Sequence, residues 1–341
     1  MPLRDLLDEA VGKVPTADPE QCVHTHAEVA SCQRCVTACP RDAWVLDDEE
    51  LGLDTDRCDG CGLCVAACPE GALSLSGAEP PITPGQATVV IACELAADGP
   101  RDWRLPCVHA VSLQQLAVLH RAGLRRLALQ TGDCGACPRN DGAGLAGRLD
   151  QMNRVLVQRG LPGIELIQPG PDRPYRAVAD AASESRLSRR GFLRRVMGAA
   201  AELHSDDGDQ RWRPPGEYLK RAVHGDFALA VPVIDPERCN GCDACIRICP
   251  HGALSLAPGA EAYRITADSC TACGLCSDVC DRDAVVVEEC TTVGQLQLPL
   301  RPGRCQACGA AFHRPRAAQG HPTLCNVCTH TNHQRNLFQV F

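Results

Sequence analysis

The chain has 341 residues and contains 25 Cys, but only 11 aromatic residues and 3 Met. Aromatic side chains normally supply much of a core's buried area, so bound metal clusters are expected to hold parts of this protein together. The formal net charge of −8 argues against a general nucleic-acid-binding surface. No apolar run reaches the roughly 18 residues of a membrane span. We expect no signal peptide, because residues 1–13 have the pattern of an amphipathic helix.

Most of the Cys stand in tight groups, two or three residues apart. Disulfide scaffolds are usually short, secreted and signal-bearing, whereas close Cys spacing suits metal ligation. We therefore expect a protein of the reducing cytoplasm that holds metal centres through thiolates.

Composition and hydrophobic periodicity divide the chain into seven parts. In chain order these are a leader (1–20), a first Cys-rich domain (21–80), an α/β domain (86–170), a polar linker with one short helix (171–230), a second Cys-rich domain (231–290), a pair of CxxC motifs (300–333) and a tail (334–341).

The strongest signal is a Cys motif with two, two and three intervening residues, which occurs three times. Its copies are Cys58-Cys61-Cys64-Cys68, Cys239-Cys242-Cys245-Cys249 and Cys270-Cys273-Cys276-Cys280. A CxxCxxC loop can wrap three thiolates around three irons of one cubane, while the fourth Cys lies on the following helix and points toward another cluster.

This motif resembles that of bacterial-type dicluster ferredoxins. The resemblance extends to a Gly after the second Cys (Gly62, Gly274) and to Gly-Ala-Leu after Cys68 and Cys249. It departs at Asp281, where the family has Pro at a position that is not a ligand. For the second domain, the resemblance implies one [4Fe–4S] cluster held by Cys239, Cys242, Cys245 and Cys280, and another held by Cys270, Cys273, Cys276 and Cys249.

The first domain opens with a less regular motif, in which nine residues instead of two separate Cys22 from Cys32. We interpret residues 23–31 as an insertion. The resemblance then implies a cluster held by Cys22, Cys32, Cys35 and Cys68, and another held by Cys58, Cys61, Cys64 and Cys39. His24 or His26 remains an alternative to Cys22, and so does a three-Cys or absent first cluster.

The α/β domain alternates strand and helix signals. Strands are expected at residues 88–92, 126–130 and 164–167, and helices at residues 112–120 and 144–159. Cys93 and the pair Cys134/Cys137 follow expected strands, and Cys107 precedes the first helix. Open parallel sheets place their sites at the carboxyl ends of strands, so these Cys-bearing loops could converge.

This pattern resembles the delta-type iron–sulfur subunits of methyl-viologen-reducing hydrogenases. Ala96 stands where that family has a further Cys, and Cys137 restores a count of four. We expect one additional cluster, a [2Fe–2S] or a fifth [4Fe–4S], held by Cys93, Cys107, Cys134 and Cys137. Four ordinary buried Cys and a zinc site are the alternatives.

Two CxxC pairs separated by 16 residues follow, a spacing close to that of zinc ribbons. Four thiolates leave a tetrahedral ion no open position, so a structural Zn²⁺ is expected at Cys305, Cys308, Cys325 and Cys328, with a rubredoxin-like iron as the alternative. The remaining Cys290 is expected to be a core residue at a strand end.

Together these patterns predict an α+β multidomain protein, in which two ferredoxin-like dicluster domains flank a small α/β parallel-sheet domain and a zinc ribbon follows. With four [4Fe–4S] clusters, a further iron–sulfur site and one Zn²⁺, it would relay single electrons. The expected partner is a larger oxidoreductase: a molybdopterin enzyme such as formate dehydrogenase, a hydrogenase or a heterodisulfide-reductase-like flavoprotein.

No catalytic residue, nucleic-acid partner or direct membrane span is expected. Two other functions stay open. One is a redox sensor or assembly factor that uses cluster loss and the ribbon. The other is an enzyme with a reactive Cys in the α/β domain.

Overall fold

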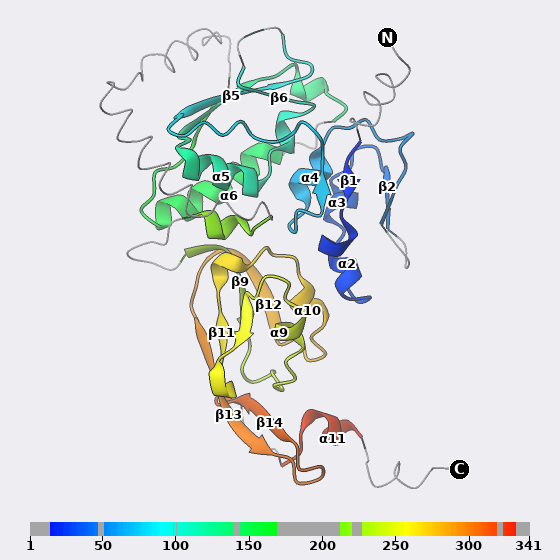
Figure 1. The fold of residues 1–341 in the computed structure, drawn as a ribbon, viewed down its shortest axis with the longest axis vertical. Helices are drawn as coiled ribbons and strands as arrows, with labels where there is room; N and C mark the ends of the chain where they lie inside the picture. The colour runs from blue at the N-terminus through cyan, green and yellow to red at the C-terminus, as the bar shows by residue number, and fades with distance from the viewer. Residues whose placement is uncertain are drawn as a thin grey trace. The chain divides into compact units, whose positions relative to one another are not determined.

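The computed structural model describes residues 14–46, 51–97, 99, 101–139, 144–168, 212–219, 227–318 and 323–331 (Figure 1). The expected helix at residues 1–13, most of the linker 171–230 and the tail 334–341 lie outside these described residues. The chain forms two compact units, one from Met1–Thr25 and Gln33–Gly225, the other from His26–Cys32 and Asp226–Phe341. Within the described part of the chain, no helix is long and apolar enough to cross a lipid bilayer.

The first unit contains a small Cys-rich domain of short elements. These are β1 (Thr16–Ala17), η1 (Pro19–Gln21), α2 (Val23–His26), α3 (Arg34–Thr37), β2 (Trp44–Leu46), β3 (Leu51–Leu53), α4 (Leu63–Ala67) and β4 (Leu73–Ser74). β1 pairs with β4 and β2 with β3, both antiparallel. Trp44, Cys64 and Leu73 form the core here, with other Cys packed around them, so thiols occupy space that larger side chains usually fill.

Gly62 begins α4 with a φ of +78°. Residues with a Cβ adopt this left-handed conformation only at a cost in free energy, because the Cβ comes too close to the backbone. This steric effect explains why Gly suits the position after the second Cys. The corresponding Gly274 has a φ of +89°.

The α/β domain belongs to the same unit and is built around a four-stranded parallel sheet in the order β6-β5-β7-β8. Its elements are β5 (Thr88–Cys93), β6 (Trp103–Leu105), η2 (Val108–Ala110), α5 (Leu113–Ala122), β7 (Arg126–Gln130), η3 (Cys134–Ala136), α6 (Gly144–Gln158) and β8 (Glu165–Ile167). All six residues of β5 are buried, as the apolar run predicts. The helices α5 and α6 lie side by side (Figure 1).

The three expected strands and both expected helices are present, and a strand that was not expected, β6, joins them. β6 is only three residues long and pairs with β5, and the side chain of Asp102 accepts a hydrogen bond from the Val90 amide at 2.8 Å. A capping box of Ser112 and Gln115 starts α5. The short 3₁₀ helix η4 (Pro215–Tyr218) falls in the expected linker but packs against α5.

The second unit repeats the arrangement of the Cys-rich domain with longer strands. Its elements are β9 (Phe227–Ile234), α9 (Ala244–Ile248), β10 (Leu254–Leu256), η5 (Pro258–Ala260), β11 (Ala262–Ile265), η6 (Ala267–Ser269), α10 (Leu275–Asp278), β12 (Val285–Thr292), β13 (Gln297–Arg304), β14 (Ala311–Pro315) and α11 (Asn326–His330). β9 pairs with β12 as β1 does with β4, and β10 pairs with β11 as β2 does with β3.

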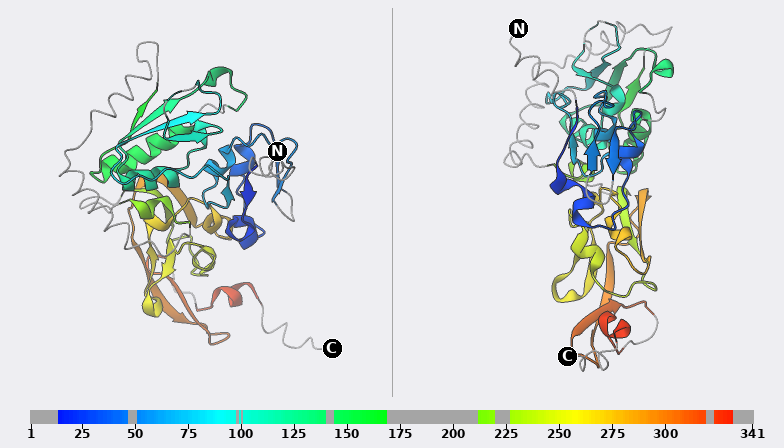
Figure 2. Two further views of the ribbon diagram at one scale, coloured as in Figure 1. Left: turned by 45° about the horizontal axis from the view of Figure 1, so that its top comes forward. Right: turned by 90° about the vertical axis from the view of Figure 1, so that its right-hand side faces the viewer.

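The strand β13 connects this domain to the Cys pairs at the C-terminal side. Residues Gln297–Pro299 pair with β11, and Leu300–Arg304 pair with β14, so one four-stranded antiparallel sheet runs in the order β10-β11-β13-β14. The hairpin β13–β14 and α11 lie at one end of the unit (Figure 2). Leu298 and Leu300 are buried in the core of the dicluster domain, so the hairpin is continuous with that domain.

The position of Cys290 differs from the expectation of a core residue at a strand end. It lies inside β12, is half-buried and has a φ of +48°.

Candidate iron–sulfur and metal sites

Eight Cys of the second unit line two cavities, which enclose about 300 and 340 Å³ counting the part open to solvent. The first is lined by Cys239, Cys242, Cys245 and Cys280. The second is lined by Cys249, Cys270, Cys273 and Cys276. Each motif thus gives three thiols to one cavity and its fourth thiol to the other, which is the grouping that a pair of cubanes requires.

Burial makes these thiols poor acids in the absence of a cation. It raises the pKa of Cys245 to about 12 and that of Cys276 to about 11, and neighbouring Cys add to both shifts. Iron that binds as a cation would displace these protons and compensate the thiolate charge. The Ala284 amide donates a hydrogen bond to Cys280 Sγ at 3.2 Å, a contact of the kind that tunes cluster potentials.

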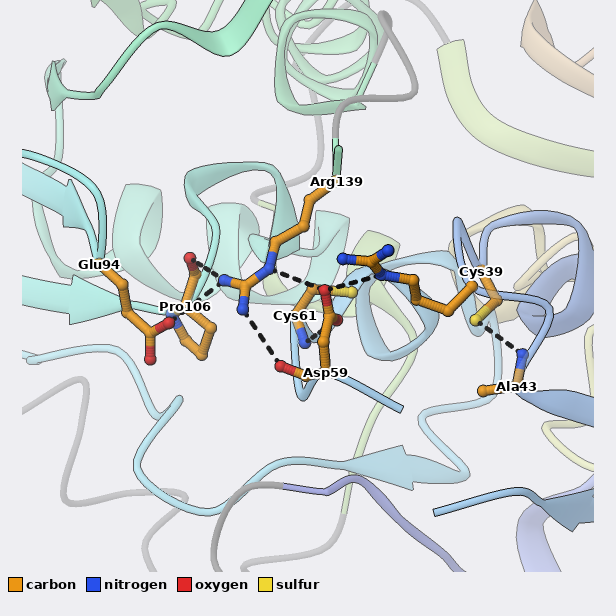
Figure 3. Close-up of polar contacts among 8 residues, drawn as sticks. Cys39, Ala43, Asp59, Cys61, Glu94, Pro106 and Arg139 are labelled. Atoms are coloured by element: carbon orange, nitrogen blue, oxygen red, sulfur yellow. Dashed lines mark hydrogen bonds and ion pairs between the residues drawn. The ribbon is translucent and has the colours of Figure 1, made fainter. Parts of the chain in front are cut away.

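The regular motif of the first unit shows the same features. Burial is the main cause that raises the pKa of Cys61 to about 12 and that of Cys64 to about 11. Cys39 and Cys58 also raise the pKa of Cys64, so the thiols of this expected ligand set lie near one another. The Ala43 amide donates to Cys39 Sγ at 3.3 Å (Figure 3), which repeats the Ala284–Cys280 contact at the equivalent position.

Two Cys of the other ligand set of the first domain share one core. Cys35 and Cys68 pack against the core around Trp44. Cys22 is half-buried at the end of η1, and Cys32 falls in the segment His26–Cys32 of the second unit. His24 is half-buried and His26 is exposed. The choice between Cys22 and a His therefore stays a prediction.

Four Cys of the α/β domain gather at the carboxyl ends of three neighbouring strands. Cys93 ends β5, Cys107 follows β6, and Cys134 and Cys137 lie at η3 after β7. Burial is the main cause that raises the pKa of Cys107 to about 11, and the other three thiols contribute to this rise, so each of them is close enough to Cys107 to interact with it. The Asp133 carboxylate accepts hydrogen bonds from the two amides that follow Cys134, which holds this loop in place.

The four Cys near the C-terminal end form a tight group. The sulfur atoms of Cys305, Cys308, Cys325 and Cys328 all lie within 4.8 Å of one another. Cys308 Sγ and Cys325 Sγ are 3.8 Å apart. A tetrahedral ion with metal–sulfur bonds of about 2.3 Å has an edge of about 3.8 Å, so the group fits one ion. Main-chain hydrogen bonds at Cys325 and Cys308 lower the pKa of Cys305 to about 6, which favours a thiolate there.

A polar contact network joins this hairpin to the first cavity of the second unit. Asp243, which directly follows Cys242, accepts hydrogen bonds from Tyr263 Oη at 2.7 Å and pairs with His313 Nε2 at 2.8 Å. Burial alone would raise the pKa of Asp243, but these partners lower it. Asn326 on α11 donates to the carbonyl of Asn240 at 2.9 Å.

Sequence reasoning missed this network and also Arg139, which contacts several Cys-bearing loops of the first unit (Figure 3). The one available signal for the network was Asp243, which occupies the position where the other two regular motifs have Gly. Nothing in the sequence distinguished Arg139 from the other Arg, of which the chain has 32 in total.

Two stretches of the chain, residues 30–73 and 231–281, match family models described as 4Fe-4S dicluster domains. Pyruvate synthase subunit PorD of Methanothermobacter marburgensis is 30% identical over 76 residues, which are 22% of this chain and 86% of that protein. Polyferredoxin protein MvhB of Methanothermus fervidus is 34% identical over 83 residues, or 23% of this chain and 19% of that protein. Pyruvate:ferredoxin oxidoreductase of Moorella thermoacetica is 26% identical over 181 residues, or 42% of this chain and 15% of that protein.

Proposed function

Because the chain belongs to the family of 4Fe-4S dicluster ferredoxins, and is thus an iron–sulfur electron-transfer protein, we propose that it relays single electrons for a larger oxidoreductase. The two dicluster domains support four [4Fe–4S] clusters. Such clusters, when bound, accept and release one electron at a time.

One observation carries the proposal. In the second unit, the two cavities share their thiols crosswise, because Cys280 joins the Cys239 group and Cys249 joins the Cys270 group. Crosswise sharing keeps two redox sites adjacent, as a relay requires. The protein's own contribution is to bury the thiols, exclude water and donate amide hydrogen bonds to sulfur, as Ala284 and Ala43 do.

The proposal includes a further iron–sulfur site at Cys93, Cys107, Cys134 and Cys137, a [2Fe–2S] or a fifth [4Fe–4S]. The gathering of these four thiols at one edge of the sheet supports it. We further propose that Cys22, Cys32, Cys35 and Cys68 hold the remaining cluster of the first domain, with His24 or His26 as the alternative to Cys22.

For the C-terminal Cys group we propose a structural Zn²⁺ in a ribbon. The short sulfur–sulfur distance supports a single tetrahedral ion, and four thiolates leave no position open for a substrate. The ion would hold α11 beside β13 and β14, and with it the contacts to the cluster loop.

The partner is proposed as an oxidoreductase, in the reducing cytoplasm. Relatives whose names are pyruvate synthase subunit and pyruvate:ferredoxin oxidoreductase support that class. The hydrogenase-like Cys pattern of the α/β domain supports a hydrogenase or a heterodisulfide-reductase-like flavoprotein as the partner. A molybdopterin enzyme such as formate dehydrogenase would also need an electron-transfer subunit.

The test is anaerobic purification of the full chain from its own host, followed by metal counting and identification of whatever purifies with it. Four cubanes give about 16 Fe per chain, a further [2Fe–2S] about 18 and a fifth cubane about 20. The double variant Cys134→Ser/Cys137→Ser is the matched control and should return the count to about 16. A chain that holds little iron would refute the proposal that this protein relays electrons. A chain that carries its full iron content but purifies alone would refute the proposal of a stable complex with an oxidoreductase.

A further inference from the structure

The Arg139 side chain lies at the junction between the α/β domain and the first Cys-rich domain, both within the first unit (Figure 3). It is 17% exposed. Its Nε donates to Asp59 Oδ2 at 3.0 Å and its Nη2 donates to the Asp59 carbonyl at 3.2 Å. Its Nη1 donates to the Pro106 carbonyl at 3.0 Å and to Glu94 Oε2 at 3.2 Å.

Every partner of this guanidinium stands beside an expected cluster ligand. Asp59 follows Cys58, Glu94 follows Cys93, and Pro106 precedes Cys107. Arg139 itself comes two residues after Cys137. One side chain therefore ties three Cys loops of the α/β domain to the CxxCxxC loop of the ferredoxin domain.

The Asp59 carboxylate extends this connection to a thiol-bearing residue. Its Oδ1 accepts a hydrogen bond from the Cys61 amide at 3.3 Å, while its Oδ2 pairs with Arg139. The loop is thus held on one side by its own backbone and on the other by the α/β domain.

The two Cys sites also pack directly against each other. Cys61 and Cys107 are both buried and share one apolar cluster with Leu63. A Cβ added to Gly62 would lie 3.2 Å from the Cβ of Ala110, so the backbones approach closely. Electron tunnelling weakens steeply with distance, and this contact leaves no solvent layer between the two loops.

We infer that Arg139 is a positioning residue that holds the Cys93/Cys107/Cys134/Cys137 site against the Cys58–Cys64 loop, so that one electron passes directly between them. The inference rests on the proposed function, because it requires a redox centre at each site. No bond forms or breaks in this step: one site loses an electron and the other gains it. A guanidinium suits the task because its planar fork can bond several fixed acceptors at once, which a Lys ammonium does less well.

The test measures the magnetic interaction between the two reduced centres by electron paramagnetic resonance, in the full chain purified anaerobically. Such an interaction falls steeply with the separation of the spins. We expect splitting or enhanced relaxation in the wild type, its loss in Arg139→Ala and no full recovery in Arg139→Lys, which restores charge but not the fork. Arg41→Ala is the matched control, because Arg41 pairs with the same Asp59 oxygen at 3.3 Å from within the ferredoxin domain. It should retain the interaction.

Iron content is measured in every sample. If Arg139→Ala loses iron, Arg139→Lys takes its place in the comparison with the wild type. A wild-type signal from the α/β site without any interaction would overturn this inference alone, and so would an unchanged interaction in Arg139→Ala. About 16 Fe per chain with no such signal in the wild type would overturn the proposed additional site, and this inference with it.

Discussion

Replacing Tyr263 by Phe tests whether the contacts around Asp243 secure the cluster loop. The substitution removes the hydroxyl that donates to Asp243 Oδ1 at 2.7 Å and leaves the ring in place. Tyr263 is 1% exposed, so water does not readily replace the lost donor. Asp243 keeps its contact with His313 Nε2 at 2.8 Å.

The expected magnitude follows from the chemistry of this contact. A hydrogen bond to a charged group contributes about 1.5–3 kcal/mol. Phe preserves the buried ring, so no cavity cost is added. Since His313 remains, we place the loss near the lower end, at about 1.5–2 kcal/mol. That free energy corresponds to an increase of about 10- to 30-fold in the population with an opened loop.

The assay is the rate of iron transfer to a chelator under anaerobic conditions, followed by the loss of visible absorbance. Where opening is a fast pre-equilibrium, this rate follows the population of the open loop. Tyr263→Phe should therefore release iron about 10- to 30-fold faster than the wild type from an equal starting content. Tyr218→Phe, at η4 of the first unit, is the matched control and should match the wild type.

A Tyr263→Phe rate within about twofold of the wild type, less than about 0.5 kcal/mol, would refute the reasoning. Equal acceleration in Tyr218→Phe would also refute it, since the effect would then not depend on Asp243.

Three further predictions concern other parts of the molecule. Cys328→Ser should lower the zinc content and speed amide exchange at residues 240–243, because α11 and β14 would lose their hold on that loop; unchanged exchange with zinc absent would contradict this. Burial lowers the pKa of His120 below its usual 6.5, so unfolding exposes a site that takes up a proton; stability should fall as the pH drops from about 6.5 toward the folded pKa, and denaturant titrations of His120→Gln should lack this slope. Gly71→Ala should lower the free energy of unfolding by at least about 1–2 kcal/mol, because Gly71 has a φ of +65° and the new Cβ would clash with the Trp212 ring; an unchanged free energy of unfolding in denaturant titrations would count against it.

The sequence alone determined the local chemistry of this protein. One short loop can supply three thiolates to one cubane, so the spacing of Cys239, Cys242 and Cys245 predicts a cluster site without coordinates. Three of the four strands of the parallel sheet could also be predicted from the sequence, because a run such as Thr88–Cys93 is buried on both faces and needs apolar residues throughout. The pattern of residues 112–120 predicted a helix, and α5 is present there.

Only the tertiary structure decided how these parts connect. β6 is too short to show a period, and the continuity of β13 with the dicluster sheet depends on pairing with β11. Arg139 reaches Asp59 across 80 residues, and His313 reaches Asp243 across 70. Spacing along the chain reports only what neighbouring residues can do together. Contacts between distant loops depend on which surfaces the folded domains bring into contact, and these contacts hold the Cys sites beside one another.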